Sequence, residues 1–93
     1  MNLPTLEAFT KTSTANGCTE VLVREWTPNQ ELAEHTHPFR ADALIVQGEM
    51  WLITKEQTQH LKVGDTFHLD AHVPHSEKYG PQGAVYWVAR TNA

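Results

Sequence analysis

Three histidines stand out in this sequence as residues that could hold a metal ion. His35-Thr36-His37 places two imidazoles two residues apart, and His75 follows far along the chain. On a β-strand, residues i and i+2 leave the same face, roughly 6.5 Å apart along the chain. Two rings this close can converge on one ion at metal–nitrogen distances of about 2.1 Å. On a helix the same side chains would point about 200° apart, so the pair predicts both a strand and a metal site.

An aspartate follows the histidine pair at a short distance. Pro38 ends or kinks the histidine strand, because proline lacks an N–H group and has a fixed φ. After the turn, Asp42 shares one face of the next strand with Leu44 and Val46. We expect this face to point inward, which makes Asp42 a candidate oxygen ligand beside the histidines.

The other histidines carry weaker signals. Pro74 sets His75 at the start of the last hairpin, where a barrel strand can turn its first side chain inward. His72, three residues earlier, either overhangs the pocket as an acid or base or is an exposed loop residue, and we favour the exposed position. His60 and His68 are predicted to lie on exposed strand faces.

The rest of the chain is predicted to form short strands separated by glycine, proline and asparagine turns. We predict strands at residues 21–26, 43–46, 50–54, 57–63, 66–69, 75–79 and 83–90. About seven strands at intervals of 8–12 residues are typical of a sandwich or barrel. Residues 29–34 are expected to be a loop leading into a strand. Residues 3–10 form either a first strand or an arm that pairs with another subunit.

Taken in order, these motifs resemble the cupin family. The first cupin signature is a His-x-His pair, a Glu after three or four residues, and a Gly about six residues later. The matching residues here are His35, His37, Asp42 and Gly48. The second signature opens with Gly-Asp, has Pro-x-Gly in its middle and ends in His. Its matching residues are Gly64-Asp65, Asp70-Ala71-His72 and His75.

Three positions depart from the cupin pattern. Asp42 replaces the usual Glu and is one methylene shorter, so it either ligates directly, binds through water, or orients a histidine ring. Asp70 and His72 replace the usual Pro and Gly, which predicts a reshaped loop. Asn29 replaces the Gly that usually opens the first signature, but asparagine can still adopt a left-handed turn conformation.

The resemblance implies an all-β fold, a small jelly-roll-like barrel of six to eight strands that often dimerises. We expect one cupin domain over residues 1–93, with an arm or edge strand at 1–19 and the barrel at 20–91. It also implies one divalent metal ion held by His35, His37, Asp42 and His75. Imidazole and carboxylate ligands suit Fe, Mn, Ni, Co or Zn, and do not choose among them.

Length, composition and charge limit the alternatives. The chain has 93 residues, so one domain is expected, and its stability should benefit from a metal or a partner subunit. A net charge of −4 without a Lys/Arg cluster disfavours nucleic-acid binding. No apolar run approaches the ~20 residues of a membrane span, and the N-terminus lacks a signal-peptide pattern, so a cytoplasmic location is expected. The single cysteine, Cys18, excludes an intrachain disulfide.

Three functions remain open. Three histidines and one carboxylate leave open coordination positions, which favours a metal-dependent enzyme of the oxygenase, isomerase or lyase type acting on a small polar molecule. The alternatives are a non-catalytic sensor of a metal or metabolite, and a cupin that uses its metal only for stability or binds none. No catalytic residue is assigned. Arg24 and Arg40 are candidates to hold a substrate carboxylate, although a solvated position is favoured for both. Apolar residues on both faces of several strands predict a homodimer.

Overall fold

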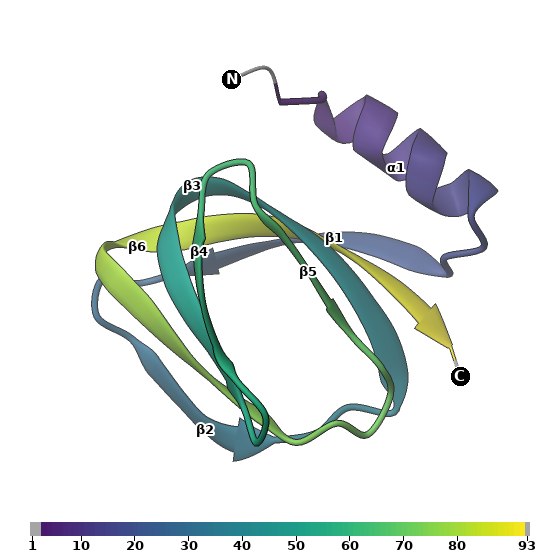
Figure 1. The fold of residues 1–93 in the computed structure, drawn as a ribbon. Helices are drawn as coiled ribbons and strands as arrows, with labels where there is room; N and C mark the ends of the chain where they lie inside the picture. The colour runs from purple at the N-terminus through teal and green to yellow at the C-terminus, as the bar shows by residue number, and fades with distance from the viewer. Residues whose placement is uncertain (1–2, 93) are drawn as a thin grey trace.

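Strands dominate the computed structural model, which describes residues 3–92 (Figure 1). The elements are α1 (Leu6–Ala15), β1 (Glu20–Trp26), β2 (Glu31–His35), β3 (Phe39–Thr54), β4 (Thr58–Lys62), β5 (Thr66–Leu69) and β6 (His75–Asn92). All strand pairs are antiparallel and belong to one six-stranded sheet. The predicted all-β, jelly-roll-like class is confirmed.

The two longest strands form the middle of this sheet. β3 and β6 pair along almost their whole lengths. β2 pairs with the first half of β6 and β1 with the second half. In the same way, β5 pairs with the first half of β3 and β4 with the second half. The sheet is folded over, so that its two halves face each other and enclose the interior of a barrel (Figure 1).

Glycines allow the long strands to bend at this fold. Gly48 in β3 and Gly83 in β6 both have a φ of +71°, a left-handed conformation that side chains disfavour. A Cβ atom on Gly48 would collide with the carbonyl oxygen of Gly83. The separate strands predicted at 43–46 and 50–54 are therefore one continuous strand, as are those predicted at 75–79 and 83–90. Pairing continues through each bend with local register shifts.

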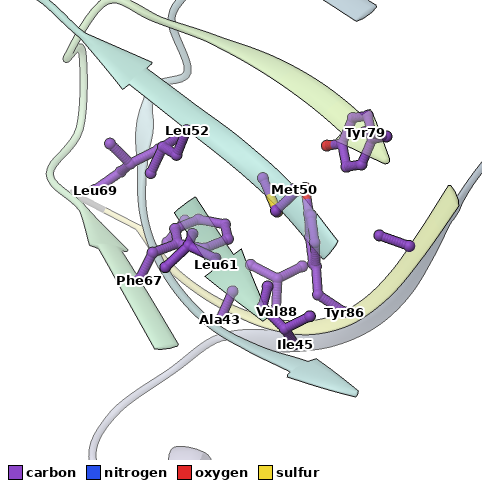
Figure 2. Packing of buried hydrophobic residues seen from close by; sticks show 12 residues of the cluster. Ala43, Ile45, Met50, Leu52, Leu61, Phe67, Leu69, Tyr79, Tyr86 and Val88 are labelled. Carbon is purple, nitrogen blue, oxygen red and sulfur yellow. The ribbon is translucent and has the colours of Figure 1, made fainter. Parts of the chain in front are cut away.

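The hydrophobic core lies between the two halves of the sheet. Ile45, Met50 and Leu52 are completely or almost completely buried, and their side chains pack with Phe67, Leu69 and other apolar residues (Figure 2). Burying a side chain of this kind contributes about 1.5–3 kcal/mol. The core therefore holds the halves together and leaves one part of the interior for the histidines.

Leu6–Ala15 form a helix, so of the two alternatives for residues 3–10, a first strand or an arm, the strand is wrong. The side chain of Thr5 caps the helix by accepting a hydrogen bond from the backbone N–H of Ala8 at 3.0 Å. α1 lies outside the barrel (Figure 1), where the ring of Phe9 lies 5.8 Å from that of Trp87 in β6. The cap and the Leu6–Phe9 spacing favour a helix over a strand. Among residues 3–92, no helix has the length and apolarity to cross a bilayer.

The loops beside the barrel contain two residues in left-handed conformations. Asn29, with a φ of 59°, supplies the turn predicted for it at the start of β2. His72, with a φ of 66°, adopts the conformation that glycine favours. Its backbone N–H donates to the carbonyl oxygen of His37 at 2.7 Å. This bond ties the loop before β6 to the end of the histidine pair.

Candidate metal centre

Three histidine side chains meet inside one end of the barrel. His35 lies at the end of β2 and pairs directly with His75 at the start of β6. Their ring centroids are 4.3 Å apart, and that of His37 lies 4.7 Å from His75 and 5.3 Å from His35. The ligand atoms of the three residues all lie within 4.8 Å of one another. The convergence expected from the spacing is therefore present, and the group could hold a metal ion.

Backbone carbonyls orient two of the rings. The Nδ1 atom of His35 lies 2.7 Å from the carbonyl oxygen of Ala33, and that of His75 lies 2.9 Å from the carbonyl oxygen of Val73. A carbonyl oxygen can only accept, so each neutral ring donates its Nδ1–H and keeps the lone pair on Nε2. This arrangement orients a metal-binding histidine, and it fits a divalent transition-metal ion.

His37 completes the group as a neutral ring. It stacks on Phe39, with centroids 4.5 Å apart and planes inclined by 9°. Burial, above all, together with the neighbouring His75 and His35, lowers the pKa of His37 to about 4. The ring is therefore uncharged at neutral pH, which leaves a nitrogen lone pair available for a ligand bond.

Glu77 adds a buried carboxylate beside the histidines. Its side chain follows His75 by two residues in β6, so both point to the interior, and only 4% of Glu77 is exposed. Its Oε2 atom lies 3.6 Å from Nε2 of His35 and 3.9 Å from Nε2 of His75. Sequence reasoning missed this residue, although His75-Ser76-Glu77 repeats the i, i+2 spacing that identified the first pair.

Two tyrosines compensate for burying the Glu77 carboxylate. Tyr79 donates its hydroxyl hydrogen to Oε1 at 2.6 Å, and Tyr86 donates to the same oxygen at 3.3 Å. Burial, above all, raises the pKa of both phenols well above the ordinary value, so they remain protonated donors. Oε2 is left facing the histidines, where it can act as a fourth ligand beside the three nitrogens.

These side chains line a cavity of about 230 Å³ at this end of the barrel. Its polar wall consists of the three histidines, Glu77, Arg24 and Arg90. Its apolar wall comes from all the strands except β4, and consists of Trp26, Leu32, Phe39, Ala41, Phe67, Leu69, Tyr86 and Val88. A metal ion bound by the histidines would therefore face a small, mostly apolar space.

Comparison with known proteins assigns the family. Residues 19–89 match the model of the AraC-like ligand binding domain. The chain belongs to this family. A stretch of 36 residues is also 53% identical to an uncharacterized HTH-type transcriptional regulator of Haemophilus influenzae. That stretch covers 39% of this chain and only 12% of the regulator.

The AraC-like ligand binding domain has the fold of solved cupin structures. A DMSP lyase structure, described with RdDddP and RnDddQII, superposes with a TM-score of 0.73 at 22% identity, over 78% of this chain and 38% of the lyase. An RmlC-like cupin from Shewanella frigidimarina superposes with a TM-score of 0.66 at 24% identity, over 80% and 68% of the two chains. The cupin resemblance is thus confirmed at the level of the fold.

In this AraC-like domain, Asp42, which the sequence predicted as a fourth ligand, is not part of the histidine group that could hold a metal ion. Its neighbours Ala41 and Ala43 point into the core, so Asp42 points out of the barrel. Asp42 faces His68 across the β3–β5 ladder, with its Oδ1 atom 2.7 Å from Nδ1 of His68. Its Oδ2 atom lies 3.5 Å from Nε of Arg40. Asp42 thus lies on the outer face of β3, opposite to our expectation.

The remaining histidines of the domain lie outside the cavity, as predicted. His68 is exposed, and Asp42 and Asp70 raise its pKa by hydrogen bonding to the ring. His60 in β4 stacks on Trp51 and bonds Glu49 at 2.8 Å. His72 is an exposed loop residue that does not line the cavity.

Proposed function

We propose that this domain binds one divalent transition-metal ion through His35, His37 and His75, with Glu77 as an oxygen ligand. We further propose that the ion and the cavity together hold a small molecule, as a sensor or regulatory ligand-binding domain does. The observation that carries the proposal is the convergence of three imidazoles whose ligand atoms lie within 4.8 Å. Two of these rings are held by backbone carbonyls with Nε2 free to bind.

The donor set supports an open site and not a closed structural one. Three nitrogens and one carboxylate leave positions free on a five- or six-coordinate ion. Thiolates are common in structural zinc sites, and this group of described residues contains none. Fe, Mn, Ni, Co and Zn all accept such ligands. When bound, the ion would supply a Lewis-acid centre for an oxygen or nitrogen atom of the ligand.

The family match supports ligand sensing above catalysis. It covers residues 19–89 and concerns a ligand binding domain, and the shorter match of 36 residues is to an HTH-type regulator. Metal-dependent catalysis of the oxygenase, isomerase or lyase type is the second candidate. It is favoured by Glu77, which is buried in the cavity with two phenol hydrogens on its other oxygen and can exchange a proton with a bound molecule.

Elemental analysis and metal titration test the metal centre. We expect the wild-type domain to bind about one equivalent of Zn²⁺ or Ni²⁺ in calorimetry, since the residues form one ligand group. His37→Ala and His75→Ala should each abolish stoichiometric binding. His68→Ala is the matched control, because His68 bonds Asp42 on the outer face and its loss should leave metal binding unchanged. Equal metal binding by wild type and His37→Ala would refute the site.

A second experiment separates the two functions. The metal-loaded domain is incubated with a panel of small acids, thiols and enediols, while O₂ consumption and product formation are followed. Sensing predicts no turnover, together with ligands that raise the melting temperature or change the oligomeric state. Turnover that is lost in His37→Ala would establish the enzyme instead.

A further inference from the structure

Two arginines share the cavity with the histidines. Arg24 projects from β1 and Arg90 from the second half of β6. The guanidinium carbon of Arg24 lies 5.0 Å from the ring centroid of Trp26, and that of Arg90 lies 4.4 Å from the centroid of Phe39. Stacking on an aromatic face holds the guanidinium plane and leaves its N–H edge free for an acceptor.

The charges of these arginines are only partly offset. Arg90 bonds the carboxylate of Glu20 at 3.2 Å. Arg24 has no acidic side chain within 4.0 Å among residues 3–92. Of the residues that the structure describes, Glu77 is the one acidic residue in the cavity wall, and its Oε1 atom already accepts from the tyrosines. A bound divalent cation would make this space more positive still, which favours an anionic ligand.

Unpaired hydrogen-bond donors belong to the same wall. The Nε1 atom of Trp26 and the Nε atom of Arg90 are buried and have no hydrogen-bond partner among the described residues. Buried N–H groups without an acceptor are uncommon in folded proteins. Both residues line the cavity, so an acceptor bound there could satisfy donors that the protein leaves free.

The size and the apolar wall restrict the rest of the ligand. About 230 Å³ is less than the 300–1,000 Å³ typical of sites for drug-sized molecules. The apolar side chains of Leu32, Phe67, Leu69 and Val88 form much of the remaining wall. A molecule with hydroxyl groups on every side would lose its hydrogen bonds to water against this wall. The apolar side chains would offer no hydrogen bonds in their place. A short apolar body with one anionic end fits better.

Resting on the metal centre proposed above, we propose that the ligand is a small organic carboxylate. Its anionic group is bound beside Arg24 and Arg90, and its apolar body packs on the cavity wall. Guanidinium groups bind carboxylates through paired, charge-assisted hydrogen bonds, which gives this recognition its geometry.

Calorimetry with matched acids and amides tests this inference. Zinc is first titrated into the full domain, and the loaded protein is then titrated with three- to six-carbon carboxylic acids and their primary amides. We expect at least one acid to bind ten-fold or more tightly than its amide. Arg24→Ala should weaken that acid at least ten-fold while zinc binding is retained. Arg24→Lys, which keeps the charge but loses the fork of donors, should give an intermediate loss.

Arg40→Ala is the matched control, because Arg40 lies with Asp42 on the outer face and should leave acid binding unchanged. Circular dichroism of each variant checks that it folds. If wild type binds no zinc, the metal centre and the inference both fail. If zinc binds but no acid binds better than its amide, only the carboxylate inference is overturned. Full acid binding by both Arg24 variants overturns it equally.

Discussion

Two acidic residues of this chain show how the environment decides a side chain's role. Asp42 is half-exposed on the outer face, where it bonds His68 and contacts Arg40. Glu77 is buried against two of the histidines and accepts hydrogen bonds from two tyrosines. Burying a carboxylate costs free energy unless hydrogen-bond partners compensate for its lost hydration, as the two tyrosines do here. Glu77 is therefore the carboxylate in our proposed metal site.

Replacing Glu77 with glutamine should weaken metal binding by roughly 10–100-fold, because the amide keeps the shape but removes the negative charge beside the ion. Metal titration by calorimetry measures the change. Asp42→Asn is the control and should bind metal as wild type does. The opposite ranking of the two variants would return Asp42 to the ligand set.

His72 is a residue whose type conflicts with its backbone conformation. Because its φ is 66°, a residue with a Cβ atom pays about 1–2 kcal/mol there that glycine does not. Glycine has a more flexible unfolded state, so the gain is partly cancelled. We expect His72→Gly to raise the free energy of unfolding by about 0.5–1 kcal/mol, measured in urea. A destabilised variant would mean that the His72 side chain makes a contact that matters.

At the scale of elements, the barrel depends on two strands that bend without breaking. β3 and β6 pass from one half of the sheet to the other and remain paired. A Cβ atom on Gly48 would collide with the backbone of Gly83. One on Gly83 would collide with the backbone of Trp26, at the turn between β1 and β2. The first half of β6, which carries His75 and Glu77, lies before its bend and pairs with β2, which carries His35, so the site depends on this arrangement.

Gly48→Ala should therefore destabilise the domain by roughly 3 kcal/mol, through the disfavoured φ together with a backbone collision. For a domain of this size, that corresponds to a fall in melting temperature of about 12–24 °C. Gly17→Ala is the matched control. Gly17 also has a positive φ, +94°, but among residues 3–92 no atom beyond its chain neighbours lies within 4 Å of its added Cβ atom. Similar losses for the two variants would show that packing at the bend is loose.

For the whole molecule, stability should depend on pH through the cluster of His68, Asp42 and Asp70. Hydrogen bonds to Asp42 and then Asp70 raise the pKa of His68 above its ordinary 6.5. A raised folded-state pKa means that the stabilisation is fully present below about pH 6.5 and is lost as the pH rises through the folded value.

Because His68 is half-exposed, solvent screening limits the effect to a few tenths of a kcal/mol. Urea unfolding of the metal-free protein with chelator present, at pH 5.5 and 8.5, measures it. His68→Gln should be less stable than wild type at pH 5.5, and the gap should shrink at pH 8.5. A gap that widens with rising pH would contradict the raised pKa.

The assembly state is a further property of the whole molecule. The outer face of the β1–β6 pair carries Val23, which is 46% exposed, opposite Trp87 in the ladder. β1 is also an edge strand with no neighbour on its other side among residues 3–92. An exposed, partly apolar edge favours pairing with another chain. We predict a homodimer in light scattering at micromolar concentration. Val23→Lys should shift the mass toward that of the monomer. A monomer mass for the wild-type protein would disprove the predicted dimer.

Some features of this protein could be predicted from local patterns alone. The i, i+2 spacing of His35 and His37 predicts that both rings meet at one point, although β2 ends at His35 and His37 lies just beyond it. The order of the two motifs predicts the cupin fold and the meeting of His75 with the first pair. The left-handed turn at Asn29 is also local, and the structure has all of these features.

Other features were decided only by the tertiary structure. Alternation along β3 groups Asp42 with Leu44 and Val46, but which group faces the interior depends on how Pro38 turns the chain and on pairing with β5 and β6. The continuity of β3 and β6 likewise depends on backbone contacts at the bend between residues far apart in sequence. Alternation is a local property of each strand, whereas the inside of the barrel exists only after distant strands have paired. That is why the sequence could identify the three histidines, whereas only the fold showed that Glu77, and not Asp42, lies beside them.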